Sequence, residues 1–351
     1  MTLIFSHIND VTGLLCIGDI IGSRAGSRES NIVLPLRDAT FRSETEERSV
    51  TTLLQKTTIR NRTLFQWSGN SLNASIILKK LLTQSTDGRD HADFKKIVES
   101  GDVPPSQLAD LSLIYHYLHN DGKVSRICWN CTENSPDQLD YRYAGSGLGN
   151  FFYNFQLDYE DDHPDYVAVR HDLMARIVTN TILERYSNTT LDSFYGGWLE
   201  LTYRTASSFA KLPYGIKFWS FKDDVLGSGG PTYLGWYHGA TLLITRHQFH
   251  ETTAGVQAKL ANTIVPDFLV GKPQGDFLDF QAQNAEMIFH IVIDEEGKRF
   301  FCHLDTTPSP ASFLVSTSPA GLRIQEGSNF RAEMLQRLGS KPRNWMEVTW
   351  N

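Results

Sequence analysis

The sequence has 351 residues, 40% of them hydrophobic, which is enough for one large domain or for a core with an accessory domain. Its net charge is -7, with 33 basic residues interspersed among 40 acidic ones, and this excludes the basic surface typical of nucleic-acid-binding proteins. No stretch approaches the roughly 20 apolar residues of a membrane-spanning helix, so we expect no membrane segment.

The chain begins with a stretch rich in β-forming residues, 3–8, and a turn-prone segment joins it to a second apolar run, 14–17. This pattern predicts a hairpin. The opening residues lack the basic region and unbroken apolar run of a secretory signal, and the four cysteines fit reduced thiols, so we expect a cytoplasmic protein. Because methionine is usually removed before a small residue, we expect Thr2 to be the mature N-terminus.

A polar segment at about 22–50 interrupts the pattern, and we interpret it as an insertion or mobile loop. Two further strands are expected at 57–59 and 63–67. A helix begins within the sequence SGNSLNASIILKKLL, where the apolar residues have helical spacing. A second helix is predicted over 106–119, between a Pro-Pro pair and an Asn-Asp-Gly turn.

Strands resume at 123–130 and 138–145 and are followed by a glycine-rich turn, GSGLGN, into a short helix. A long helix is predicted over 164–186 from its apolar residues at three- and four-residue spacing, and strands follow at 198–203 and 215–221. This order of elements predicts a layered α+β fold, in which pairs of helices cover the two faces of packed antiparallel sheets. Beyond Lys222 a glycine-rich stretch suggests a boundary, and the clearest later unit is a hairpin over 287–304.

Four short motifs occur in the order found in the N-terminal nucleophile hydrolases, and the chain resembles the proteasome β-subunit and its bacterial relatives within that superfamily. TLIFSHI followed by GLLCIGD resembles the family's opening hairpin, which runs from the catalytic threonine to a catalytic aspartate. QKTTIRNRTLFQWSGNSLNA resembles the segment from the catalytic lysine to the oxyanion glycine. AGSGLGNF and DSFYGGWLELTY resemble the turn with a supporting serine and the aspartate that precedes a Gly-Gly pair.

The resemblance implies a four-layer αββα sandwich over residues 2–222, containing the insertion at about 22–50, with a C-terminal accessory region over 223–351. It implies catalytic roles for six residues, namely Thr2, Asp19, Lys56, Gly69, Ser146 and Asp192. Asn73 stands where the family usually has aspartate, Tyr195 replaces a serine before the Gly-Gly pair, and the spacing from Asp19 to Lys56 is longer than usual.

The implied activity is hydrolysis of peptide bonds without a cofactor, because the α-amine of an N-terminal threonine can take the proton from its own hydroxyl. The resemblance also implies a homo-oligomeric ring acting on peptides or unfolded protein, with an ATP-dependent unfoldase as a possible protein partner and with neither nucleic acid nor membrane. Two other readings stay open. One is a catalytically inactive scaffold that binds a partner through the insertion and the C-terminal region, and the other is a small-molecule amidase on the same fold.

Three other motifs are weaker. Gly145-x-Gly147-x-x-Asn150 resembles a dinucleotide fingerprint but has no third glycine. Cys128 and Cys131 form a C-x-x-C pair that could be a redox or zinc half-site, although buried or edge cysteines are the more common case. His247, His250 and Glu251 could share a helix face, but their order does not match a zinc protease.

Overall fold

The computed structural model divides into two compact units, which are described separately. Unit 1 lies within Met1–Asp162, Asn180–Leu212 and Pro266–Lys272, and unit 2 within His163–Thr179, Pro213–Val265 and Pro273–Asn351. The structure describes residues 3–9, 13–26, 29–37, 39–42, 48–83, 91–134, 140–145, 177–178, 180–186, 189–192, 195–252, 255–267, 269, 283–294, 299–318, 321–340 and 345–349.

The first sheet of unit 1 contains the predicted N-terminal hairpin. Its six strands run in the order β11-β12-β1-β2-β13-β14, and every neighbouring pair is antiparallel. The pairing of Ile4 with Gly18 confirms the hairpin and sets Asp19 at the end of its second strand. The strands are β1 (Ile4–Asn9), β2 (Gly13–Asp19), β11 (Thr132–Asn134), β12 (Asp140–Ala144), β13 (Leu199–Arg204) and β14 (Phe209–Lys211).

The second sheet of unit 1 has four antiparallel strands in the order β10-β9-β8-β7. They are β7 (Thr57–Arg60), β8 (Thr63–Ser68), β9 (Ser112–Leu118) and β10 (Val124–Trp129). The two sheets pack against each other, because Leu14 and Cys16 of the first share a buried cluster with Leu64 and Leu118 of the second. Gln66 joins them further, since its Nε2 donates hydrogen bonds to main-chain oxygens of the hairpin.

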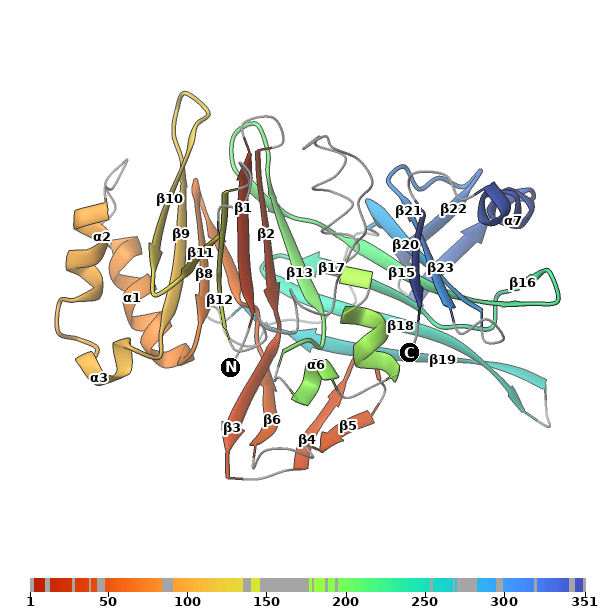
Figure 1. Cartoon of the computed structure of the whole chain (residues 1–351), viewed down its shortest axis with the longest axis horizontal. Helices are drawn as coiled ribbons and strands as arrows, with labels where there is room; N and C mark the ends of the chain where they lie inside the picture. The colour runs from red at the N-terminus through yellow and green to blue at the C-terminus, as the bar shows by residue number, and fades with distance from the viewer. Residues whose placement is uncertain are drawn as a thin grey trace. The chain divides into compact units, whose positions relative to one another are not determined.

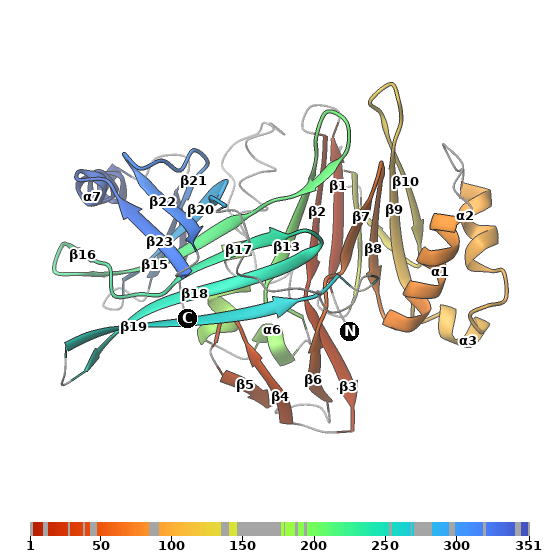
Figure 2. The ribbon, with the colours of Figure 1, turned by 180° about the vertical axis from the view of Figure 1, so that it is seen from behind.

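Helices cover the other face of the four-stranded sheet, as Figures 1 and 2 show. They are α1 (Ser71–Thr83), α2 (His91–Val98) and the short α3 (Pro105–Leu108). Apolar residues at helical spacing on α1, such as Ile77, Leu78 and Leu81, pack with Phe65 and Trp67 of β8. Asn70 begins α1, since its Oδ1 accepts hydrogen bonds from the main-chain N–H groups of the first turn.

The polar segment at about 22–50 forms strands, so its interpretation as a loop is wrong. Strand β3 (Ile21–Ala25) pairs with β6 (Arg48–Leu53), and β4 (Glu29–Leu34) pairs with β5 (Ala39–Arg42). Leu34, Phe41 and Val50 are buried residues within these two strand pairs. They are spaced widely among polar residues, which is why composition favoured a loop.

Unit 2 is built on a large sheet with the order β19-β18-β17-β15-β20-β21-β24, to which β16 adds at β15. The pair β15–β20 is parallel, and the predicted hairpin over 287–304 is confirmed as β20 and β21. A two-stranded sheet, β22–β23, and helix α7 (Phe330–Ser340) pack on this sheet around Trp219, Phe313 and Phe330. The strands are β15 (Tyr214–Lys222), β16 (Val225–Gly227), β17 (Thr232–His238), β18 (Thr241–Thr252), β19 (Gly255–Val265), β20 (Met287–Asp294), β21 (Arg299–Asp305), β22 (Phe313–Ser318), β23 (Gly321–Glu326) and β24 (Trp345–Thr349).

The expected four-layer αββα sandwich is contradicted, because the structure is mostly strand and distributes its strands over many small antiparallel sheets. The predicted helix over 106–119 is wrong: only 105–108 is helical, and 112–118 is strand β9. Strand β9 is buried on both faces, and a continuous apolar run of this kind does not distinguish a strand from a helix by periodicity. Of the long helix predicted over 164–186, residues 164–176 lie outside the described residues, whereas 180–186 are helical.

Among the helices in the described part of the chain, none is both long enough and apolar enough to cross a membrane.

Candidate functional site

A cavity of about 280 Å³ in unit 1 contains two of the residues singled out by the sequence, Lys56 and Gly69. One wall comes from the paired strands β3 and β6, and the opposite wall comes from β8 and the start of α1. Its lining residues are Gly22, Ser23, Arg24, Thr51, Thr52, Leu54, Lys56, Trp67, Gly69, Asn70 and Ser71. The segment interpreted as a loop therefore supplies a wall of this cavity.

Two cations line the cavity, the exposed Arg24 and Lys56, whose side chain is almost fully buried. The Lys56 Nζ lies 4.0 Å from the centre of the Trp67 ring, a distance at which a cation and an aromatic face attract each other. Burial lowers the pKa of Lys56 to about 8, while the negative charges of Asp19 and Glu200 act in the opposite direction. An amine with a pKa this close to neutrality can exchange protons under ordinary conditions.

Asp19 is the acidic partner of Lys56, and it is fully buried. Its Oδ1 accepts a hydrogen bond of 2.9 Å from the Leu3 main-chain N–H, and its Oδ2 accepts one of 3.2 Å from that of Gly196. Burial raises the pKa of Asp19 to about 6, and the positive charge of Lys56 is the largest influence in the other direction. Near pH 7 the carboxylate is therefore mostly ionised and the lysine mostly protonated.

Gly69 is held in a backbone conformation that demands glycine. Its φ is +104°, and a Cβ at this position would lie 2.0 Å from the Asp110 main-chain oxygen. Gly69 lines the cavity two residues before the start of α1. A helix start and a lysine that line one cavity are an arrangement suited to stabilising negative charge.

Glu200 and Lys211 form a second buried charged pair next to Lys56. The sequence motifs identified neither residue. The Lys211 Nζ lies 2.6 Å from Oε1 of Glu200, and Oε2 of Glu200 accepts a 2.7 Å hydrogen bond from the Lys56 main-chain N–H. Glu200 thus connects β13 to Lys56. A charged residue within the apolar strand sequence WLELTY was the available signal.

Glu184 was also not identified from the sequence motifs. It is a buried acid whose pKa is affected by the negative charge of Asp19. It is 2% exposed, and its Oε2 accepts a 2.7 Å hydrogen bond from the Gly197 main-chain N–H. Within the described part of the chain, its Oε1 has no hydrogen-bond partner. Burial raises the pKa of Glu184 to about 8, and the negative charge of Asp19 adds to the rise.

The structure thus places the charges of Asp19 and Lys56 close enough to shift each other's pKa, and Lys56 and Gly69 line the same cavity. Asp192 is half-buried at the end of α6 (Thr189–Asp192), and it is not among the charges that shift the pKa of Lys56 or Asp19. Thr2 and Ser146 lie outside the described residues.

The two residues that depart from the family motif have structural contacts in the core. Asn73 is buried in α1, where its Nδ2 donates a 3.0 Å hydrogen bond to Oε1 of Gln107. Tyr195 is buried, and its hydroxyl donates a hydrogen bond to Oδ1 of Asn180. The bulk of Tyr195 is therefore accommodated inside unit 1.

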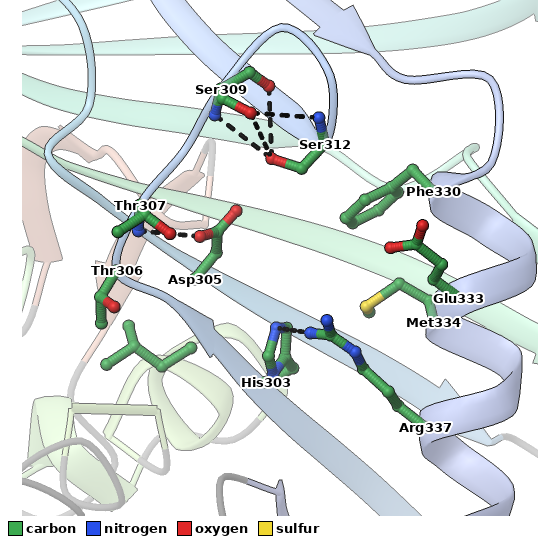
Figure 3. Close-up of a pocket in the computed structure, with 11 residues that line it drawn as sticks. His303, Asp305, Thr306, Thr307, Ser309, Ser312, Phe330, Glu333, Met334 and Arg337 are labelled. Carbon is green, nitrogen blue, oxygen red and sulfur yellow. Dashed lines mark hydrogen bonds between the residues drawn. The ribbon is translucent and has the colours of Figure 1, made fainter.

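Unit 2 has a cavity of about 340 Å³ between β21 and α7, shown in Figure 3. Arg337 Nη1 lies 3.0 Å from Nε2 of His303, and a guanidinium can only donate, so the histidine nitrogen is the acceptor. Burial lowers the pKa of His303 to about 4, and the Arg337 charge lowers it further. Asp305 accepts a 2.9 Å hydrogen bond from the Thr307 main-chain N–H on the same wall. The cavity is therefore polar, with a neutral histidine at neutral pH.

The histidine-rich motif and the dinucleotide-like motif do not assemble as sites in the described residues. His247, His250 and Glu251 lie on strand β18 and therefore do not share a helix face. Gly145 is described, but 146–150 are not, and the dinucleotide-like motif therefore lies largely outside the described residues. Within the described ranges no cluster of three or more His, Cys, Asp or Glu side chains could hold a metal ion. No protein-family model matches the sequence, and none of the curated proteins matches it significantly.

Proposed function

We propose that this protein is an N-terminal-threonine amide hydrolase that acts on peptides or unfolded protein. The observation that carries the proposal is the charge-coupled pair of Lys56 and Asp19, with Lys56 lining the same cavity as the Gly69 main chain. Buried groups whose pKa values lie near neutrality are typical of catalytic sites. The family resemblance of the sequence motifs supplies the nucleophile, Thr2.

In the proposed reaction the Thr2 hydroxyl attacks the amide carbonyl and its own α-amine takes the proton. The protonated Lys56 keeps that amine neutral, since a nearby positive charge lowers an amine's pKa. The Leu3 main-chain N–H donates a hydrogen bond to Asp19. Because Leu3 directly follows Thr2 in the sequence, this contact supports the proposal that the amine of Thr2 is close to the charges of Asp19 and Lys56. The Gly69 N–H would bind the oxyanion, a contact that contributes about 3 to 4 kcal/mol in other hydrolases. Water then releases the acyl group.

Ser146 and Asp192 are proposed to orient the amine and the water, by the resemblance alone. A homo-oligomeric ring in the cytoplasm, with or without an unfoldase partner, also belongs to this proposal. Native mass spectrometry at micromolar concentration tests the ring, and a clean monomer would count against it.

The nucleophile is tested by labelling with a threonine-directed electrophile, after intact mass has established that the chain starts at Thr2. We expect the wild type to be labelled and Thr2→Ala to be unlabelled and inactive on peptide substrates. Thr2→Ser keeps a hydroxyl and an amine and should retain part of the activity. Thr12→Ala is a matched control that should behave as the wild type. A Thr2→Ala variant that hydrolyses peptides at the wild-type rate would refute the proposal.

The second candidate is a protein that binds a ligand or partner without catalysis, and the cavity of unit 2 favours it. That cavity is larger than the one around Lys56 and carries Arg337, His303 and Asp305 on its walls. Retention of Met1 in the purified protein would favour this function, because the α-amine of Thr2 would then be blocked.

A further inference from the structure

Cys128 is the second-last residue of β10, and Cys131 follows two residues after the end of that strand. Both side chains pack against the same small apolar cluster of Ile4, Ile114 and Ala144. Both are only partly buried, whereas the other two cysteines, Cys16 and Cys302, are buried. The C-x-x-C pair is therefore the accessible thiol pair of the described chain.

Asn130 fixes the turn that brings the two thiols together. Its φ is +48°, in the left-handed region that asparagine tolerates better than most residues. Its side-chain Nδ2 donates hydrogen bonds of 2.8 Å to the Leu108 oxygen and 3.0 Å to the Leu111 oxygen, and its own main-chain oxygen accepts one of 2.8 Å from Ser112 Oγ. The turn between the two cysteines is therefore held in place by hydrogen bonds to three residues of the neighbouring segment.

The two thiols are chemically different. The interaction with Cys131 and the positive charges of Arg126 and Arg142 lower the pKa of Cys128, while burial acts in the opposite direction. The interaction with Cys128 and burial raise the pKa of Cys131, whose thiol shares its proton between the main-chain oxygens of Leu113 and Trp129, each 3.3 Å from Sγ. Cys128 is thus the better thiolate, and the thiolate is the nucleophile in cysteine chemistry.

We propose that Cys128 and Cys131 are a redox-active dithiol that closes reversibly to a disulfide on reaction with a small peroxide. This inference does not depend on the proposed hydrolase activity. Cys128 is the attacking residue and Cys131 the resolving residue. Both side chains pack against one small cluster, and this shared position is what formation of an S–S bond of about 2.05 Å requires.

The reaction has two steps. The Cys128 thiolate attacks one oxygen of hydrogen peroxide, so an S–O bond forms, the O–O bond breaks and the leaving hydroxide takes a proton to become water. The Cys131 sulfur then attacks the Cys128 sulfur, the S–S bond forms, and the S–O bond breaks to release hydroxide, which takes the thiol proton. In sum two thiols lose two electrons and two protons, and one peroxide becomes two waters.

The test treats the purified full chain with hydrogen peroxide, alkylates the remaining thiols and measures intact and peptide masses. We expect the loss of two hydrogen atoms and of two alkylation sites, both in the peptide that contains 128–131, and full reversal by dithiothreitol. Cys131→Ser should stop at the sulfenic acid of Cys128, which dimedone traps. Cys128→Ser should leave Cys131 reduced, and the matched controls Cys16→Ser and Cys302→Ser should still close the disulfide.

Two outcomes would overturn the proposal. In one, peroxide leaves both thiols open to alkylation under conditions that oxidise free cysteine. In the other, oxidation occurs at Cys16 or Cys302, or between chains, instead of within the pair. Asn130→Gly, which keeps the left-handed turn but loses the side-chain hydrogen bonds, tests the role of the turn. We expect slower disulfide closure in this variant, and an unchanged rate would refute that role.

Discussion

Lys56 and Trp67 are joined twice, through the main chain and through the side chains. The Trp67 main-chain N–H donates a 3.1 Å hydrogen bond to the Lys56 oxygen, and the Lys56 Nζ lies 4.0 Å from the centre of the Trp67 ring. The indole therefore fixes the ammonium at one place on the cavity wall and shields it from water. Because the position of the ammonium is fixed, substitution of Lys56 tests the role of a positive charge at one defined place.

Replacing Lys56 should abolish hydrolysis while the protein stays folded. Lys56→Met removes the charge, keeps much of the side-chain volume and leaves the pocket beside Trp67 filled, so we expect loss of turnover and of electrophile labelling. Lys79→Met is the matched control, because Lys79 is exposed on α1. Peptide hydrolysis and circular dichroism measure the two effects. Wild-type turnover in Lys56→Met would remove Lys56 from the mechanism.

The pH dependence of hydrolysis should be bell-shaped. As pH falls through about 6, Asp19 takes up a proton and loses its negative charge. As pH rises through about 8, Lys56 loses its proton and its positive charge. Since the proposed reaction needs both charges, kcat/KM should be highest between these values and fall on both sides. In Asp19→Asn the acid limb should disappear along with most of the activity, and a flat profile in the wild type would contradict the assignment.

Gly69→Ala should be far more harmful than Gly101→Ala. Both glycines have positive φ, +104° and +88°, so both substitutions introduce backbone strain of about 1 kcal/mol. Only at Gly69 does the new Cβ meet an obstacle, the Asp110 oxygen at 2.0 Å, whereas nothing lies within 4 Å at Gly101. Urea unfolding should therefore show a loss of several kcal/mol for Gly69→Ala, about the upper end for single substitutions. Equal losses in the two variants would mean that the clash is relieved by movement of the chain.

Glu184→Gln should stabilise the protein, and the gain should grow with pH. The folded protein holds the Glu184 proton up to a pKa of about 8, compared with 4.5 for an unperturbed glutamate. Between these values the folded state binds more protons than the unfolded state, so stability falls as pH rises. Glutamine has no such dependence. Because one pKa unit corresponds to about 1.4 kcal/mol, the gain near pH 7 should reach a few kcal/mol. Unfolding midpoints at pH 5 and pH 7.5 measure it, and a pH-independent difference would contradict the prediction.

Lys211→Met should destabilise unit 1, although the substitution removes a single positive charge that is partly accessible to solvent. The Lys211 side chain is 10% exposed and Glu200 is fully buried, so the substitution leaves a carboxylate without its partner inside the protein. Removing one partner of a buried pair costs about 3 to 5 kcal/mol. The control Lys123→Met removes an exposed ion pair with Asp121 and should change stability by less than about 1 kcal/mol. The double variant Lys211→Met/Glu200→Met should recover part of the loss.

Local patterns predicted the elements around the site. The hairpin that ends at Asp19, the strand that begins after Lys56 and the helix after Gly69 all have short-range signals in turn residues and apolar spacing. These signals placed Asp19, Lys56 and Gly69 at the ends of the correct elements, whereas β6, which precedes Lys56, begins in the segment that was interpreted as a loop. The proximity of these three residues in space depends on the packing of the two sheets. In the sequence, only the order of the four family-like motifs suggested this proximity.

The rest depended on long-range packing. Residues 112–118 are buried on both faces as strand β9, and their apolar run fits a helix equally well in the sequence. In the sequence, Glu200 occupies the polar position of an alternating strand, which predicts an exposed side chain. Both faces of β13 are buried, however, and Glu200 is the buried ion-pair partner of Lys211. No local pattern reports that a second layer covers a strand.

The parallel pairing of β15 with β20 has a consequence for how unit 2 folds. Tyr214 pairs with Met287 and Phe221 with Asp294, while β17, β18 and β19 between them are joined in sequence by antiparallel pairs. The antiparallel hairpins close short loops and form within microseconds, whereas the parallel pair must first bring distant segments together. We therefore expect the entry of β20 beside β15 to limit the refolding rate of unit 2, so substitutions on these two strands should slow refolding more than equally destabilising substitutions within the β18–β19 hairpin.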